Sequence, residues 1–300
     1  MTQTQTTSTA ADRPMQAAPP ATPGRRVRVP RPSVYHALML TAAFVWLTPI
    51  IWMFSLALTP NSVLRRSTTS LLPQALTWEN FSAVFDVGLM LRWFSNSLLV
   101  TTIATVLTVL FCAMAGYAFA KIQFPLRRLV FVFVIAGLMV PKEAMFVPLF
   151  LMFSEVDQHN TYQALFLPRI AAPLGVFLMT QFFSQVPREI EEAARVDGAG
   201  RWRIFWSIML PLARPALASL AIFTFVLTWN DYLWPLVSAT ERQMFTVTTG
   251  LASLQGNFAQ AEELGSLMAR GIVGCLPLLV FFLLFQRQLI RGITLTSGEK

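Results

Sequence analysis

Long runs without charged residues constrain this chain more than any other feature. Residues 93–120 contain no Asp, Glu, Lys or Arg, and a second uncharged apolar run covers residues 37–58. The shorter run rises about 33 Å as a helix, enough to cross a hydrocarbon core roughly 30 Å thick. Charged residues make up 13% of the chain, about half their share in a typical soluble domain. A water-soluble monomer is therefore excluded, and we expect an all-α, polytopic membrane protein.

The apolar runs predict six transmembrane helices within a membrane domain of residues 37–290. The expected spans are residues 37–58, 93–120, 129–153, 167–186, 213–237 and 266–287. Residues 1–36 are predicted to form a flexible tail, because their Thr, Ala, Pro, Gln and Arg side chains bury too little apolar surface to fold. Residues 291–300 form a second tail. The first span is too long for a cleaved signal peptide, so we interpret it as an anchor.

Basic residues are distributed unequally between the two sides of these spans. With six spans, one side receives 16 of the 23 Lys and Arg residues. The positive-inside rule places that side, and with it both termini, in the cytoplasm. The same bias accounts for the net charge of +8 and the pI near 10.3. Nucleic-acid binding is therefore not required, and the expected location is the inner or plasma membrane.

Polar and small residues inside the spans suggest where helices or a solute make contact. The candidates for lining a translocation path are Asn96, Asn230, Asp231 and Trp234. Asp231 should have a cavity or a partner, since a charge at the centre of a span costs about 2.5–3.5 kcal/mol. Each candidate has a second interpretation, because Asn and Asp also bond helices together and Trp also gathers at membrane interfaces. Gly116 and Ala120 predict a close helix–helix approach.

Lys142, Glu143 and Arg270 are further charges within the predicted spans. Lys142 and Glu143 are adjacent, so they do not face each other on a helix. Because Pro141 and Pro148 interrupt this region, we expect the two charges near the outer end of the third span. They are either an interfacial bend or charges that face a pathway. Arg270 should reach an interface or a cavity.

The chain is poorly supplied for catalysis and for metal binding. Cys112 and Cys275 both lie in apolar runs and form neither a disulfide framework nor a metal-ligand pattern. His36 and His159 belong to opposite ends of the predicted fold, which makes a nucleophile–base pair hard to assemble. We therefore expect no enzyme activity, no metal site and no cofactor in this chain.

The connection between the fourth and fifth spans, residues 187–211, carries the most information. Acidic residues crowd the first turns of a predicted helix, where the helix dipole favours negative charge. Asp197 and Gly198 supply the stop, since glycine readily adopts the left-handed conformation that closes many helices. A second short helix over residues 201–209 places four large apolar side chains at helical spacing: Trp202, Phe205, Trp206 and Met209.

This connection resembles the EAA loop of permease subunits of bacterial binding-protein-dependent ABC importers. The resemblance rests on eight residues at the family's spacing: Glu192, Ala193, Ala194, Asp197, Gly198, Ile208, Leu210 and Pro211. Other stretches resemble the carbohydrate-uptake, maltose-type branch, including Glu79-Asn80-Phe81, Asn96-Ser97, Gly116-Tyr117-Ala118, Trp229-Asn230-Asp231 and Trp234-Pro235-Leu236. The resemblance covers residues 37–294, and the C-terminus follows the family's ending only loosely.

The resemblance implies a mechanism and a set of partners. The loop would be a coupling helix that docks into a cleft of a separate ATP-hydrolysing subunit. Glu192 would offer a carboxylate, Ala193 and Ala194 would permit close approach, and Gly198 would provide the turn. ATP would bind to that partner, because this chain has no G-x-x-x-x-G-K-[ST] run. The implied partners are a second permease subunit, two ATP-binding subunits, an extracytoplasmic solute-binding protein, membrane lipid and a sugar-type solute.

Two other functions stay open at this point. An ion-coupled secondary transporter is one, although no internal repeat is evident and intramembrane carboxylates are scarce. The other is an ABC permease for a non-sugar solute, such as a glycerol phosphate ester.

Overall fold

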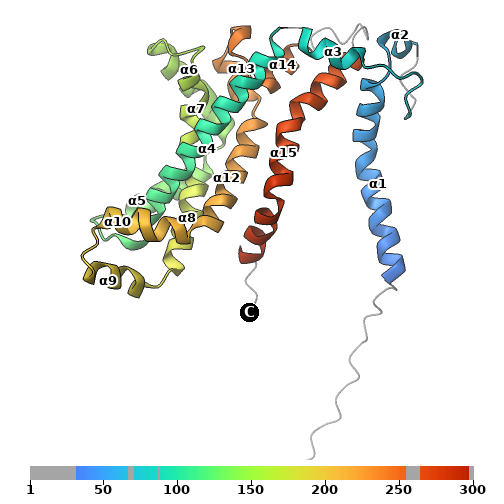
Figure 1. The fold of residues 1–300 in the computed structure, drawn as a ribbon. Helices are drawn as coiled ribbons and strands as arrows, with labels where there is room; N and C mark the ends of the chain where they lie inside the picture. The colour runs from blue at the N-terminus through green and yellow to red at the C-terminus, as the bar shows by residue number, and fades with distance from the viewer. Residues whose placement is uncertain (1–31, 67–70, 87, 255–263, 297–300) are drawn as a thin grey trace, which may run out of the picture. The chain divides into compact units, whose positions relative to one another are not determined.

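The computed structural model describes residues 32–66, 71–86, 88–254 and 264–296, and every regular element within them is helical (Figure 1). The predicted all-α class is therefore confirmed. The long helices are α1 (Pro32–Ala57), α4 (Met90–Lys121), α12 (Arg214–Trp229) and α15 (Leu264–Thr296). The shorter helices are α2 (Asn61–Leu64), α3 (Glu79–Asp86), α5 (Arg127–Ala136), α6 (Phe146–Glu155), α7 (Tyr162–Ile170), α8 (Pro173–Gln185), α9 (Arg188–Val196), α10 (Arg201–Ile204), α11 (Leu210–Leu212), α13 (Leu233–Ser238) and α14 (Val247–Ser253).

The chain divides into two compact units, residues 1–48 and residues 49–300. The described part of the first unit is the beginning of α1, which starts at Pro32, because proline suits a first helical position. No residue of α1 between Val34 and Phe54 is buried within the chain, as expected of a helix that contacts lipid or a partner. Most of the predicted N-terminal tail, residues 1–31, lies outside the described residues.

The second unit is built around α4, which packs against α8 and α12. Its contact with α8 depends on Gly116, where an added Cβ atom would lie 2.6 Å from Met179 Cβ. Gly175 makes the reciprocal approach from α8, since a Cβ atom there would lie 2.6 Å from Cys112 Sγ. The close approach that Gly116 predicted is therefore confirmed.

Membrane-spanning candidates occur both as single helices and as bent pairs. Within the described ranges, three single helices are long and apolar enough to cross a membrane, namely α1, α4 and α15. Three bent pairs also qualify if each is counted as one span: α5 with α6 at 99°, α7 with α8 at 44°, and residues 201–212 with α12 at 77°. The structure therefore supports a multi-pass membrane protein with between three and six spans.

Proline explains two of the bends. Val140 precedes Pro141 and Ala172 precedes Pro173, and both leave the helical conformation, with ψ of 117° and 88°. A proline disfavours helical geometry in the residue before it. Pro148 behaves differently, because it lies in the first turn of α6, where a missing N–H is tolerated. Pro141 therefore interrupts the third predicted span and Pro148 does not.

The last two predicted spans differ from the helices observed. The fifth, residues 213–237, is broken, because α12 ends at Trp229 and α13 begins at Leu233. The sixth is longer than predicted, since α15 continues through residues 291–296, which the sequence assigned to a tail. Residues 297–300 lie outside the described residues. In Figure 1, α9 and α10 lie at the end of the second unit where α4 finishes, away from α13 and α14.

Candidate functional site

Residues 188–212, here called the 188–212 hairpin, consist of α9 and a second arm made of α10, the π-helical turn Phe205–Met209 and α11. Gly198 joins the two arms with a positive φ of 79°. Its amide donates to the carbonyl of Arg195 at 3.0 Å, and the amide of Ala199 donates to that of Ala194 at 2.9 Å. These two bonds form a Schellman motif. The predicted stop at Gly198 is confirmed.

The two faces of α9 are used differently. The exposed residues of the predicted motif are Glu192, Ala193, Asp197 and Gly198. Glu191 and Ala194 are buried, and Ala194 packs into the hydrophobic cluster that α4, α8 and the second arm share. The hairpin therefore presents Glu192 outward while Ala194 fixes α9 to the rest of the chain.

The second arm buries only part of its apolar surface. Phe205 and Met209 enter the core together with Ile204, whereas Trp202 and Trp206 remain exposed. The remaining motif residues, Ile208, Leu210 and Pro211, are partly buried. The π-helical turn ends just before Leu210 and Pro211, and proline cannot donate the bond that a regular α-helix requires. The four predicted apolar residues thus divide into a buried pair and an exposed pair.

A polar cavity of about 240 Å³ lies where α4 ends against the hairpin. Its charged lining comprises Lys121, Arg188, Glu191, Glu192, Arg195 and Arg201. The ammonium of Lys121 donates to the carbonyl of Val186, directly before α9. Glu191 Oε2 lies 3.4 Å from Arg195 Nη2. The end of α4 and the base of α9 therefore meet through charged and polar groups rather than through apolar packing alone.

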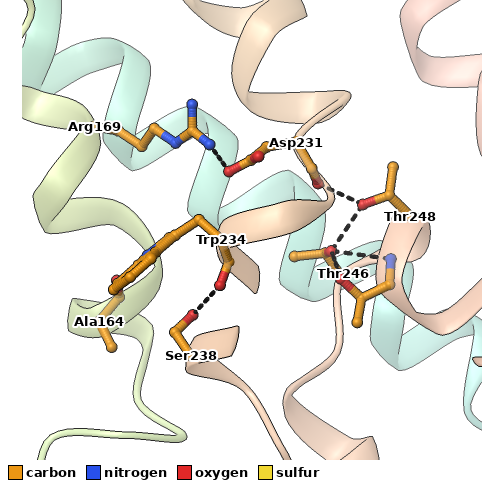
Figure 2. A network of polar contacts seen from close by, with 8 residues as sticks. Ala164, Arg169, Asp231, Trp234, Ser238, Thr246 and Thr248 are labelled. Carbon is orange, nitrogen blue, oxygen red and sulfur yellow. Dashed lines mark hydrogen bonds and ion pairs between the residues drawn. The ribbon is translucent and has the colours of Figure 1, made fainter. Parts of the chain in front are cut away.

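An ion pair joins two helix breaks elsewhere in the second unit (Figure 2). Arg169 lies in the last turn of α7, and Asp231 lies between α12 and α13. Their side chains are 18% and 13% exposed. The backbone carbonyl of Asp231 accepts a hydrogen bond of 2.6 Å from Thr248 Oγ1. The partner expected for Asp231 therefore exists, and it is Arg169.

Asn96 is committed to a different junction. Its side-chain amide donates to the carbonyls of Gln243 at 2.8 Å and of Phe245 at 3.0 Å, while Asn96 Oδ1 accepts from the Tyr162 hydroxyl at 2.9 Å. The side chain is buried. Asn96 thus ties α4 to the connection before α14 and to the start of α7.

Trp234 and Asn230 flank the ion pair on opposite sides of Asp231 in the sequence. Trp234 is buried, and its indole Nε1 donates to the carbonyl of Ala164 at 2.8 Å (Figure 2). Asn230 is exposed, and its amide returns to the carbonyl of Val226 at 2.9 Å. Of the predicted path residues, Asn230 and Asp231 therefore lie at the helix break, and Trp234 anchors α13 to α7.

The other intramembrane charges occupy separate places. Lys142 and Glu143 begin the 3₁₀ turn Lys142–Met145 at the 99° bend, and both are exposed. This agrees with the bend that the sequence predicted. Arg270 is buried on α15, so it does not reach an exposed interface of this chain.

Two residues of these sites escaped the sequence analysis. Arg169 falls just inside a predicted span, and nothing local indicates that its partner is Asp231. Glu191 was only one of several acids in the first turns of the predicted helix, although it shares a helix face with Ala194 and Arg195 at spacings of three and four residues. That spacing is the signal that could have found it.

Comparisons with known proteins agree on one family. The family described as "Binding-protein-dependent transport system inner membrane component" matches residues 110–295. The arabinooligosaccharide transport system permease protein AraQ of Halalkalibacterium halodurans is 37% identical over 255 residues, 84% of this chain and 91% of that protein. The trehalose transport system permease protein SugB of Mycobacterium tuberculosis is 33% identical over 267 residues, 88% and 97% of the two chains.

A solved structure has the same fold. It is a chain from a bacterial ABC transporter involved in the import of the acidic polysaccharide alginate. The TM-score is 0.72 at 23% sequence identity, and the match covers 85% of this chain and 95% of that one.

Proposed function

Because this chain belongs to the family of binding-protein-dependent transport system inner membrane components, we propose that it is the permease subunit of an ATP-driven importer for a sugar or oligosaccharide. The chain is a multi-pass membrane permease and not itself an enzyme. The solute class rests on one observation, namely that relatives aligned over most of the chain are permeases of arabinooligosaccharide and trehalose transport systems. The ion-coupled secondary transporter does not fit this family.

The 188–212 hairpin transmits ATP hydrolysis to the membrane helices in this proposal. Its first arm, α9, exposes Glu192 and Ala193, and the Schellman turn at its tip exposes Asp197 and Gly198. Glu192 pairs with a basic group of an ATP-binding subunit, and the small Ala193 lets the two backbones approach closely. Ala194 holds α9 against the core from the other side. These contacts support a hairpin that is held firmly against the core and is accessible to a partner subunit.

The complete transporter contains further chains. It comprises this permease, a second permease subunit, two ATP-binding subunits and an extracytoplasmic solute-binding protein. ATP binds to the ATP-binding subunits, since this sequence has no phosphate-binding G-x-x-x-x-G-K-[ST] run. This chain contributes six spans, of which the third and the fourth are bent pairs and the fifth begins with α12, so that the hairpin and both termini lie in the cytoplasm. The bias of basic residues supports that orientation.

The Arg169–Asp231 pair and Asn230 belong to the translocation path. Ionisable groups inside a membrane protein are costly and normally face a water-filled cavity or a functional partner. A guanidinium and a carboxylate also supply the donors and acceptors that sugar hydroxyls require. Asn96 and Trp234 do not contact the solute in this proposal. They hold the helices around the path together, because their side chains donate to backbone carbonyls of this chain.

Reconstitution tests the proposal. The chain is co-expressed with its neighbouring transporter genes, purified in mild detergent and placed in proteoliposomes with the binding protein. We expect ATP-binding subunits to co-purify and labelled oligosaccharide to enter the vesicles only when ATP is hydrolysed. Uptake driven by an ion gradient in the absence of ATP would overturn the proposal. Uptake of a glycerol phosphate ester, with no sugar accepted, would overturn the solute class alone.

A further inference from the structure

We infer that the carboxylate of Glu191 and the hydroxyl of Tyr117 form a polar joint through which the hairpin moves α4 during transport. The inference rests on the proposed coupling role of the hairpin. It adds the groups on this chain that receive the movement, one residue away from the acid that faces the ATP-binding subunit.

Glu191 is the buried acid of the hairpin. Its side chain is 6% exposed, while the next residue, Glu192, faces outward. Oε2 meets the guanidinium of Arg195 at 3.4 Å, which is a long contact, and the Arg195 side chain is 51% exposed. Glu191 Oε1 is buried without a hydrogen-bond partner among the described residues. A buried carboxylate oxygen without a donor is costly, so its placement calls for a physical reason.

Tyr117 on α4 has a buried hydroxyl that lacks a hydrogen-bond acceptor among the described residues. Its ring is buried between those of Phe183 and Phe205, with centroid distances of 5.9 and 5.4 Å. Its hydroxyl is also buried, with no partner in the part of the chain that the structure describes. Glu191 lines the polar cavity together with Lys121, which follows Tyr117 by one turn on α4. The phenol is thus a donor without an acceptor, near a carboxylate that is an acceptor without a donor.

The surroundings of these two groups allow a small movement between α9 and α4. Ala194 and Tyr117 belong to one hydrophobic cluster, which keeps the helices in contact. Lys121, one turn beyond Tyr117, holds the carbonyl of Val186 at the base of α9. The polar cavity lies beside this contact and leaves room for Glu191 to shift. A shift of α9 therefore makes or breaks the Tyr117–Glu191 bond without separating the helices.

A bond that is present in one state and absent in another gives the hairpin two discrete positions, which is what a switching element requires. The bond is unmade in this structure. It forms, with the Tyr117 hydroxyl donating to Glu191 Oε1, when the ATP-binding subunits press the hairpin against α4. The two adjacent acids thus have separate roles: Glu192 contacts the ATP-binding subunit, and Glu191 transmits the movement to α4 through Tyr117.

The test measures solute transported per ATP hydrolysed by the complete reconstituted transporter. Tyr117→Phe removes one oxygen and keeps the ring, so the packing survives. Glu191→Leu removes the acceptor, and Glu191→Gln keeps a weaker one. Glu189→Leu is the matched control, because Glu189 is an exposed acid on the same helix that does not line the cavity.

We expect Tyr117→Phe and Glu191→Leu to lower the ratio about fivefold or more, the lower end of typical couplings between sites. Glu191→Gln should fall between them and the wild type, and Glu189→Leu should match the wild type. Co-purification of the ATP-binding subunits should be unchanged in Tyr117→Phe. The double variant Tyr117→Phe, Glu191→Leu should be no worse than either single variant, because both break the same joint.

Several results would contradict the proposed Tyr117–Glu191 hydrogen bond. A wild-type ratio in Tyr117→Phe is one, and effects that multiply in the double variant are another. A parallel fall of transport, ATP hydrolysis and complex yield in Tyr117→Phe would show a structural role only. If Glu191→Leu assembles poorly, Tyr117→Phe decides alone. A wild-type chain that transports without ATP would instead overturn the proposed function, so the two failures are distinguishable.

Discussion

The helical chain turns at Gly198 and again around Asp231, and the two turns are held in opposite ways. The turn at Gly198 is closed by hydrogen bonds between residues three and five positions apart, both within the 188–212 hairpin. The break around Asp231 is held by Arg169 on α7 and by Thr248 on α14. The hydrogen bonds that close the Gly198 turn are therefore kept when the hairpin moves as proposed. The Asp231 break cannot move without breaking contacts to distant helices.

The buried acids of the two regions show the same contrast. Asp231 is ion-paired with an arginine from another helix. Glu191 meets only an arginine one turn away on its own helix, and its second oxygen has no partner in the described part of the chain. A buried acid that fixes a fold has its charge compensated by a distant residue. The incomplete compensation of Glu191 agrees with the movement proposed for the hairpin, because it lowers the cost of changing the surroundings of this acid.

Removing the distant partner should have the largest effect on stability. Arg169→Ala leaves the Asp231 carboxylate uncompensated, which should cost about 3 kcal/mol of unfolding free energy. Thermal or denaturant unfolding of the purified complex in detergent measures this loss. The double variant Arg169→Ala, Asp231→Asn should recover part of it, because the uncompensated charge is gone. A loss well under about 1 kcal/mol would place this pair in the class of exposed ion pairs and break the comparison.

The second-largest loss of unfolding free energy is expected from a glycine-to-alanine change near the Asp231 break. A Cβ atom on Gly250 would lie 2.2 Å from the Trp93 ring, so α14 and α4 must separate or the ring must move. Overpacking of this kind should cost about 2 kcal/mol. The same unfolding measurement applies, and Trp93→Phe in the Gly250→Ala background should relieve part of the clash. No loss in Gly250→Ala would mean that this region is as loosely held as the hairpin.

The same change in the hairpin should cost less. Nothing lies within 4 Å of a Cβ atom on Gly198, so the only penalty of Gly198→Ala is its left-handed backbone, with φ of 79°. That penalty is about 1 kcal/mol. Gly198→Asn should be milder still, because asparagine tolerates this conformation. If Gly198→Ala destabilises the complex as much as Gly250→Ala does, the hairpin turn depends on contacts beyond its own backbone.

The smallest effect is expected from the local ion pair. Arg195 is half exposed and four residues from Glu191, and pairs of this type contribute about 0.5 kcal/mol or less. Arg195→Ala should therefore leave the unfolding of the complex almost unchanged. A loss as large as that of Arg169→Ala would show that Glu191 depends on Arg195 as Asp231 depends on Arg169.

Much of the hairpin was readable in advance because its structure is local. The acidic first turns of α9 and the stop at Gly198 follow from residues a few positions apart, whereas an outward Glu192 was expected only from the resemblance to the EAA loop. The Asp231 break was only half predicted. The cost of a charge in a membrane required a partner for Asp231, but the partner lies on another helix and has no local signature.

The amino-acid sequence by itself determined that this chain is helical and built for a membrane, because uncharged runs of this length satisfy their backbone groups in lipid only as helices. It also determined the break before Pro141, since proline acts on its immediate neighbour, whereas the bend before Pro173 has the same cause but was not predicted. Only the tertiary structure decided that Arg169 meets Asp231, that Gly116 lies against Met179 and that Glu191 is buried beneath Glu192. Each of these depends on how two helices face one another, and helix rotation is set by the sum of many weak packing contacts rather than by any local rule.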